Sequence, residues 1–249
     1  MKTQERRHLK ENDLARWLRL TSDYVAGNSR QLGMVAGAVV LIAVIVWGVM
    51  AFRQRSSSDA EAALAEALVA LNAQVNPPQT PEEVDLPAAA QLGAEGSFRT
   101  EAAKLQVAIP KLRHAADTYP DQEAGIVARY HLAGALAALG QTEEAIKEFS
   151  EVVKRAPADN VYGRMARLGQ ADTQVRAGQY DAAIAAWKQL ASENIEDLPA
   201  DAILLELARA YVAKGDTTEA RKVFTQLLDE HPTSPYSTEA RAELDSLKG

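Results

Sequence analysis

The stretch GALAALGQTEEAIKEFSEVVKRAP, residues 134–157, decides the fold of this chain. Gly140 can end a first helix, because glycine takes a left-handed conformation that other residues adopt only at a cost. In the helix that follows, Phe149 and Val152 lie about one turn apart on the same face. Pro157 then stops that helix. The stretch therefore predicts a helix–turn–helix pair that must bury its apolar face against a neighbour.

The same spacing occurs three times between Tyr119 and the C-terminus. Counted from Gly140, Gly178 and Gly215, every copy has alanine at −7 and +5, an aromatic residue at +9 and an aliphatic residue at +12. The members of the set are Ala133, Ala145, Phe149 and Val152; Ala171, Ala183, Trp187 and Leu190; and Ala208, Ala220, Phe224 and Leu227. The small alanines let two helices approach, and the larger residues fill the gap to the next pair. A period of this kind predicts an α-helical solenoid.

The repeats resemble the tetratricopeptide repeat, most closely in residues 134–157 and 206–232. The middle copy, residues 167–190, departs from the pattern because it has Gln170 and Gln174 at packing positions and lacks the closing proline, so its first helix is expected to be looser. We also expect a degenerate first repeat, with helices over 59–75 and 100–119, a break or start at Pro110, and a Pro-rich insertion between them. A polar helix over 235–247 would cap the open end.

Composition supports an all-α fold and excludes several classes of protein. Hydrophobic residues make up 47% and charged residues 24% of the 249 residues, which is typical of a folded protein. The chain has no cysteine, so disulfides and thiolate metal sites are excluded. Residues 1–32 carry 7 Lys+Arg against 4 Asp+Glu, whereas residues 33–249 carry 20 against 30. An acidic main part is a poor match for nucleic acid, so no nucleic-acid partner is expected.

The run GMVAGAVVLIAVIVWGVMAF, residues 33–52, contains no charge over twenty residues. This length matches the hydrocarbon core of a bilayer and predicts a transmembrane helix with lipid as a partner. It is longer than the apolar core of a cleaved signal peptide, the main alternative. The basic excess before it predicts a cytoplasmic N-terminus and a periplasmic repeat domain in a bacterial inner membrane. Arg53 and Arg55 favour the opposite orientation.

Four segments follow from these features. Residues 1–32 form a cytoplasmic basic segment with a short amphipathic helix after Asp13. This helix docks on a cytoplasmic partner or on the lipid headgroup layer, or it has no further role. Residues 33–52 are the membrane helix, in which Gly33 and Gly37 offer a close-packing surface for a weak homodimer. Residues 53–97 hold the first solenoid helix and the insertion. Residues 98–249 form the repeat domain with its capping helix.

This order of segments resembles the ancillary subunit family of the bacterial Sec translocon. The resemblance covers the whole chain as architecture but only the repeats as motif. It implies a membrane-anchored adaptor that passes secreted proteins from the translocon to periplasmic chaperones. An envelope-assembly or cell-division scaffold is the alternative, because it would use the same surface on another client.

Features of an enzyme are absent from the sequence. No two of the four histidines have the spacing of metal ligands; they are His8, His114, His131 and His231. The sequence also contains no nucleophile motif and no phosphate-binding loop. We therefore expect no catalytic residues, cofactor or metal. His131 is expected either to face the binding groove or to pack beside Leu132.

Geometry predicts the binding surface, because the first helix of each pair lines the concave side of a solenoid. Positions three before and one after each alanine of these helices should face inward, and Arg176 can join them. The predicted protein-binding residues are Tyr130, Gly134, Leu168, Asp172, Arg176, Leu205 and Arg209. The two arginines would orient an acidic or carbonyl-rich client. The alternative is that the apolar members are packing residues. The convex face is expected to be polar, with Glu143, Glu144, Lys147 and Glu148 in solvent.

Overall fold

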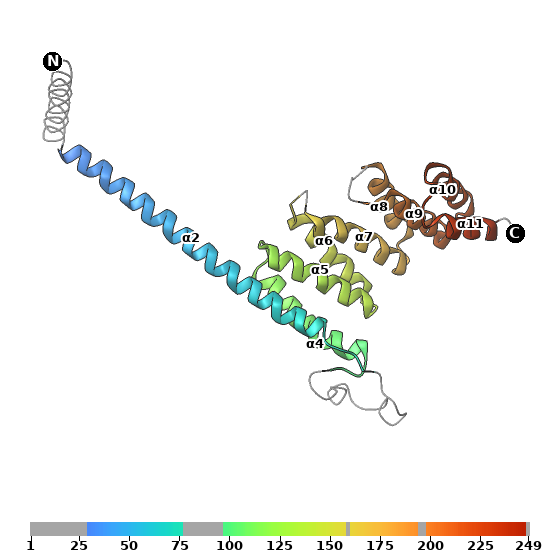
Figure 1. Ribbon diagram of the computed structural model, residues 1–249, viewed down its shortest axis with the longest axis horizontal. Helices are drawn as coiled ribbons and strands as arrows, with labels where there is room; N and C mark the ends of the chain where they lie inside the picture. Colours follow the sequence, from blue (N-terminus) through green and yellow to red (C-terminus); the bar gives the residue numbers. More distant parts are fainter. Residues whose placement is uncertain (1–28, 77–96, 158–159, 194–197, 248–249) are drawn as a thin grey trace, which may run out of the picture. The chain divides into compact units, whose positions relative to one another are not determined.

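The structure is a computed structural model that describes residues 29–76, 97–157, 160–193 and 198–247. For residues 29–33, 35–37, 39, 40, 52 and 53 it describes the backbone alone. The described residues form nine α-helices and, apart from one isolated bridge, no strand (Figure 1). The all-α class is thus confirmed for the described chain. Two units meet between Ser56 and Ser57, and each is described by itself.

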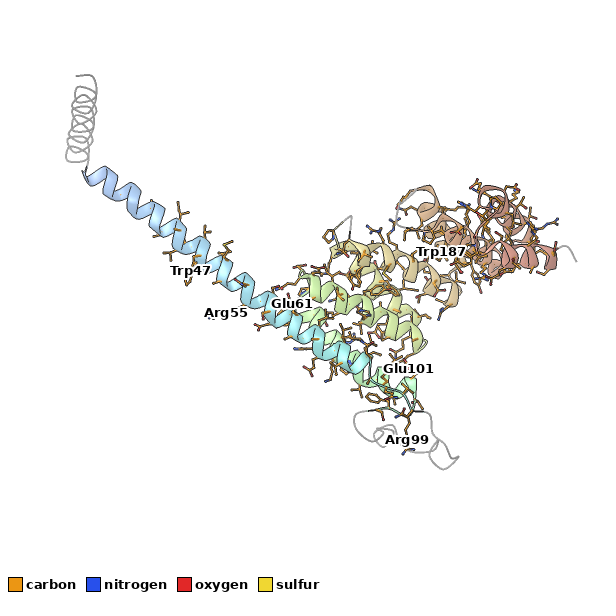
Figure 2. The ribbon with its side chains drawn as sticks, in the orientation of Figure 1. Trp47, Arg55, Glu61, Arg99, Glu101 and Trp187 are labelled. Carbon is orange, nitrogen blue, oxygen red and sulfur yellow. The ribbon has the colours of Figure 1, made fainter. Side chains whose placement is uncertain are left out.

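Helix α2, Ser29–Leu71, runs through the apolar segment and into the repeat region without interruption. Residues 53–60 contain neither glycine nor proline, so no residue there breaks the helix. In the N-terminal unit, the described large apolar side chains of residues 41–50 are half or more exposed. Trp47 is 73% exposed (Figure 2).

The predicted membrane anchor requires correction. None of the helices, over the described residues, is both long enough and apolar enough to cross a membrane. The run 33–52 is not a helix of its own, because α2 continues past it through Arg53 and Arg55 to Leu71. The lack of a spanning helix among the described residues contradicts the predicted transmembrane helix and the inner-membrane localisation. The lipid partner was predicted from that helix. The amphipathic helix after Asp13 lies outside the described residues, and the Gly33/Gly37 dimer stays a prediction.

The second unit is a stack of helix pairs, in which each helix packs against the next along the chain. The C-terminal part of α2 packs with α4 through a shared apolar cluster that includes Ala67, Leu105 and Leu112. The helices are α4 Glu101–Thr118, α5 Glu123–Ala138, α6 Thr142–Arg155, α7 Val161–Arg176, α8 Tyr180–Ser192, α9 Ala200–Lys214, α10 Thr217–Glu230 and α11 Ser237–Ser246. Helix α11 follows α10 as the predicted cap.

The spacing read from the sequence is the packing frame of this stack. All six alanines at −7 and +5 are fully buried, and the residues at +9 and +12 are at most 4% exposed. Phe149 approaches the next helix so closely that a Cβ added at Gly169 would lie 2.6 Å from its ring. Alanine and glycine are therefore required where the helices cross, because a larger side chain would push them apart.

Each repeat turns at a left-handed glycine, as predicted. Gly140, Gly178 and Gly215 have φ of 76°, 73° and 85°. After each glycine the next backbone N–H donates to a carbonyl of the preceding helix, as from Gln141 to Leu136 at 2.9 Å and from Asp216 to Tyr211 at 2.9 Å. These hydrogen bonds satisfy carbonyls that a helix end leaves free.

The first repeat differs from its prediction at Pro110. Helix α4 passes through this proline without a break. Proline cannot donate to the carbonyl of Gln106, but both residues are exposed, so water can replace that hydrogen bond. The insertion leaves the stack beside α4, where the bridge between Val75 and Phe98 pairs its two ends. The residues between them, 77–96, lie outside the described chain.

A buried arginine ties three helices together. Arg129 of α5 donates to Glu148 of α6 at 2.5 Å, to Asp117 at 2.7 Å and to the Ala116 carbonyl of α4 at 3.0 Å. Burial lowers the pKa of Arg129, but hydrogen bonds to Asp117 and Glu148 outweigh it, so this pKa lies above its ordinary value. The arginine stays charged and holds the first two repeats in register.

Candidate functional site

Helices α5, α7 and α9 are the first helices of successive repeats, and each packs against the next of the three. Their side chains therefore form one continuous surface. Two adjoining hollows lie on this surface, and they share Tyr130 and Met165 in their linings. We call the surface that contains both hollows the groove.

The first hollow, here called the aromatic hollow, measures about 580 Å³ and lies between α5, the start of α7 and the ends of α2 and α4. Its lining is mostly apolar. The residues are Leu71, Glu101, Leu105, Tyr130, His131, Gly134, Ala135, Ala138, Val161, Tyr162 and Met165. A Cβ added at Gly134 would meet nothing within 4 Å, so the helix backbone faces open space there.

Aromatic rings on one side of this hollow support one another. The Tyr130 ring centroid lies 5.4 Å from that of Tyr162 and 5.9 Å from that of Phe149. The His131 ring is 5.3 Å from Tyr130 and 6.3 Å from Tyr162. Burial lowers the pKa of His131 below its ordinary value and raises that of Tyr130. Both side chains are therefore neutral near pH 7, which keeps this hollow apolar.

The second hollow, here called the acidic hollow, measures about 380 Å³ and lies between α5, α7, α8 and α9. Its lining combines apolar side chains with two carboxylates from different helices. The residues are Tyr130, Met165, Leu168, Gly169, Asp172, Trp187 and Glu206.

Four of the predicted binding residues line these hollows. Tyr130 and Gly134 lie in the aromatic hollow, and Tyr130, Leu168 and Asp172 in the acidic one. Arg176 is exposed at the edge and pairs with Asp172 at 3.0 Å. Leu205 is 2% exposed and belongs to the core, as in the alternative reading of the apolar members. Whether any of them binds a protein stays a prediction.

The guanidinium of Arg209 is already paired with three glutamate side chains. Its Nε and Nη2 donate to Glu243 at 2.9 and 2.7 Å, its Nη1 donates to Glu206 at 3.0 Å, and its Nη2 also donates to Glu239. Burial lowers the pKa of Arg209, but these hydrogen bonds outweigh it and raise that pKa above its ordinary value. The guanidinium thus fastens the capping helix α11 to α9 and is not available to orient a client.

Sequence reasoning missed several residues of the groove. Tyr162, Met165, Trp187 and Glu206 line the hollows but were not among the predicted binding residues. The signal for one of them was present, because Met165 stands about one helical turn before Leu168. His131 lines the aromatic hollow, which agrees with one of its two expected positions.

The outer face differs from its prediction at one residue. Glu148 is 7% exposed and pairs with Arg129, so it is not part of a solvated face. Glu144 pairs with Arg113 at 2.8 Å, while Glu143 and Lys147 are exposed. The predicted polar face covers a wide arc of α6, and Glu148 lies at the edge of that arc, where α6 packs against α5.

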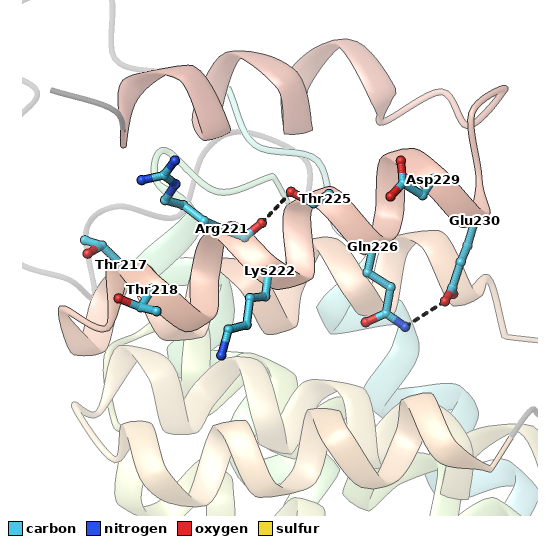
Figure 3. A pocket seen from close by; sticks show the side chains of 8 residues that line it. All are labelled: Thr217, Thr218, Arg221, Lys222, Thr225, Gln226, Asp229 and Glu230. Atoms are coloured by element: carbon cyan, nitrogen blue, oxygen red, sulfur yellow. Dashed lines mark hydrogen bonds between the residues drawn. The ribbon is translucent and has the colours of Figure 1, made fainter.

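A further hollow lies on the outer side of α10 (Figure 3). Its described lining comes from that helix alone: Thr217, Thr218, Arg221, Lys222, Thr225, Gln226, Asp229 and Glu230. The hydrogen bonds drawn there stay within the helix, from Thr225 Oγ1 to the Arg221 carbonyl at 2.8 Å and from Gln226 to Glu230 at 3.0 Å. Within the described residues, no His, Asp or Glu side chains cluster in threes to hold a metal.

Comparison with known proteins identifies the repeats. Two models of the tetratricopeptide repeat match the chain, one at residues 127–159 and one at residues 168–235. The chain contains tetratricopeptide repeats. Proteins built from such repeats are typically non-catalytic scaffolds that bind other proteins.

Solved structures agree on the fold. A putative kinesin light chain with tetratricopeptide-like repeats from Podosopora anserina is 21% identical, with a TM-score of 0.50, over 58% of this chain and 77% of that one. MamA from Desulfovibrio magneticus RS-1 is 18% identical, with a TM-score of 0.47, over 58% of this chain and 74% of that one. No curated protein matches the chain. At this identity the first likeness shows the fold alone, and the second carries no argument.

Proposed function

We propose that this chain is a protein-binding scaffold that holds a segment of a client protein in the groove along α5, α7 and α9. One observation supports the proposal: two hollows adjoin along the first helices of the repeats and expose apolar side chains, with Val161 at 49% and Met165 at 40% exposed. When a partner covers apolar side chains that line a surface hollow, their removal from water lowers the free energy and favours binding.

The finer role implied by the Sec translocon resemblance has less support. That resemblance used a membrane anchor as well as the repeats, and only the repeats are supported. A translocon adaptor, an envelope-assembly scaffold and a cell-division scaffold would all bind a client through the same groove. The identity of the bound protein separates them, so we propose the binding activity without a named client.

The direct test is photo-crosslinking in intact cells. p-Benzoylphenylalanine is placed at Met165 in the groove or at Lys147, which is exposed on the outer helix α6. We expect defined protein adducts, identified by mass spectrometry, from position 165 and not from position 147. The opposite result would place the binding surface on the outer side and reject the proposal.

A second variant checks that the adducts depend on the groove. Gly134→Leu adds a side chain in the aromatic hollow, where its Cβ would meet nothing within 4 Å. The matched control is Ala185→Leu, which adds a similar side chain on the exposed side of α8. We expect Gly134→Leu to remove the adducts at position 165 and Ala185→Leu to leave them. Equal adducts in both variants would contradict a client in this hollow.

A further inference from the structure

We propose that the groove selects a client segment that carries a large apolar side chain and, further along, a basic side chain. The apolar side chain would enter the aromatic hollow, and the basic one would lie beside Asp172 and Glu206 in the acidic hollow. This inference rests on the proposed function and names the chemistry of its client. It reverses the acidic client that Arg176 and Arg209 alone would suggest.

The aromatic hollow fits an apolar anchor. Tyr130 and Tyr162 present ring surfaces, while Met165 offers an adaptable thioether side chain at the boundary with the acidic hollow. Its volume of about 580 Å³ leaves room for a large side chain. Its one carboxylate, Glu101, already pairs with Lys104 at 2.8 Å. The rest of the lining is mostly apolar, so a charged client group would gain less there than beside the two carboxylates of the acidic hollow.

Glu206, one of the two carboxylates that line the acidic hollow, belongs to an ion-pair cluster in which carboxylates outnumber the cation. Glu206 shares the Arg209 guanidinium with Glu239 and Glu243, so three carboxylates meet one cation. The formal charge of this cluster is one positive against three negative, a net of −2. A carboxylate that shares its cation in this way still attracts a second cation.

Asp172 adds to this field from the neighbouring helix. Its partner Arg176 comes from the next turn of α7, and the two side chains are 47% and 59% exposed. Exposed ion pairs of this kind are weak, because water competes for both groups and the long side chains lose freedom. A client lysine or arginine can therefore contact Asp172 without first breaking a strong interaction.

The charge of the whole repeat region acts in the same direction. Residues 57–249 carry 18 Lys+Arg against 30 Asp+Glu, a net of −12. A net charge of this size attracts basic segments from a distance and repels acidic ones. The local carboxylates then decide where along the groove the basic group comes to lie.

The test uses synthetic peptides and the purified full chain. Three fluorescein-labelled peptides share a ten-residue Gly/Ser frame: one carries Trp and two Lys, one Trp and two Glu, and one Ala and two Lys. Binding is followed by fluorescence anisotropy at about 0.15 M salt, where long-range attraction between exposed charges is largely screened. We expect the Trp/Lys peptide to bind about tenfold or more tightly than either of the others.

Variants assign the preference to the two hollows. Asp172→Asn with Glu206→Gln should remove the preference for Lys over Glu and keep the preference for Trp over Ala. Gly134→Leu should have the opposite pattern. The control, Glu143→Gln with Asp229→Asn, removes the same charge from exposed positions on outer helices and should leave both preferences unchanged.

Three results would overturn the inference: equal or tighter binding of the Glu peptide, no binding of any peptide, or an equal loss of the Lys preference in the outer control pair. The photo-crosslinks at position 165 report on the proposed function separately, because they do not depend on these peptides. If position 165 captures a protein while no Lys preference appears, only the charge assignment fails.

Discussion

Asp172 of α7 and Glu206 of α9 line the same hollow although 34 residues separate them in the chain. They do not hold equivalent places in their repeats, because Asp172 follows Ala171 by one residue and Glu206 precedes Ala208 by two. Groove residues therefore come from staggered positions on neighbouring first helices. The stagger lets one helix supply a carboxylate beside an apolar position of the next.

Removing the buried arginine should destabilise the repeat region strongly. Arg129→Leu leaves Glu148 buried without a partner, which typically costs about 3–5 kcal/mol. Arg129→Leu with Glu148→Leu should cost clearly less, since no uncompensated charge remains. Urea unfolding followed by circular dichroism measures both variants. A double variant as unstable as the single one would show that the ion pair is not the reason.

Larger side chains at the helix crossings should also destabilise the fold. Ala145→Leu or Ala220→Leu forces extra volume into fully buried sites and is expected to cost about 1–3 kcal/mol. Ala185→Leu makes the same change at an exposed position on α8 and should have little effect. Thermal melts compare the three variants. Equal melting temperatures for the three variants would show that Ala145 and Ala220 are not the close-packed positions of the repeat.

Replacing either of two glycines with alanine should change the stability of the fold, in opposite directions. Gly178 has φ of 73°, so Gly178→Ala should cost about 1–2 kcal/mol from backbone strain. Gly134 lies inside helix α5 with open space around it, so Gly134→Ala should stabilise the helix by about 0.5–1 kcal/mol. Denaturation midpoints that shift in the same direction for both would contradict the assigned turn conformation.

Acidification should weaken the fold through His131. Burial holds the pKa of His131 below 6.5, so between the folded and unfolded pKa values the unfolded chain binds more protons. The stability that neutral His131 gives the folded chain is therefore fully present above about pH 6.5 and declines as the pH falls below that value. His131→Gln should show a smaller drop in melting temperature than the unaltered chain between pH 7.5 and 5.5. An identical drop would exclude this histidine as the cause.

The repeat frame could be predicted from sequence because the packing positions tolerate few residue types. Ala171, Trp187 and Leu190 stand at the offsets found in the other copies, and all are buried even though this copy lacks the closing proline. Gly178 could be assigned its left-handed turn for the same reason. Close helix crossings and left-handed turns accept few residue types, so those residues at a regular spacing predict where the crossings and turns lie.

The groove was harder to predict because its positions tolerate many residue types. A single offset rule selected Asp172 but not Glu206, although both line the acidic hollow, since the rule assumed equivalent places on each helix. The same rule assigned Arg209 to the client, because the carboxylates of α11 come from a helix that the rule did not consider. The continuity of α2 was missed for another reason. A change in composition at residue 52 was read as a helix boundary, although no residue there breaks a helix.

The paired backbone at Val75 and Phe98 makes the segment between them a natural site for a reporter. Asn76 donates to the Phe98 carbonyl at 2.7 Å and Phe98 donates to the Gln74 carbonyl at 2.8 Å, so the chain leaves and re-enters the stack at one point. Because the closure entropy of a loop grows only slowly with its length, a tag or a small fluorescent domain inserted here should leave the repeats in register. Such a fusion would make binding in the groove measurable by energy transfer from a labelled peptide.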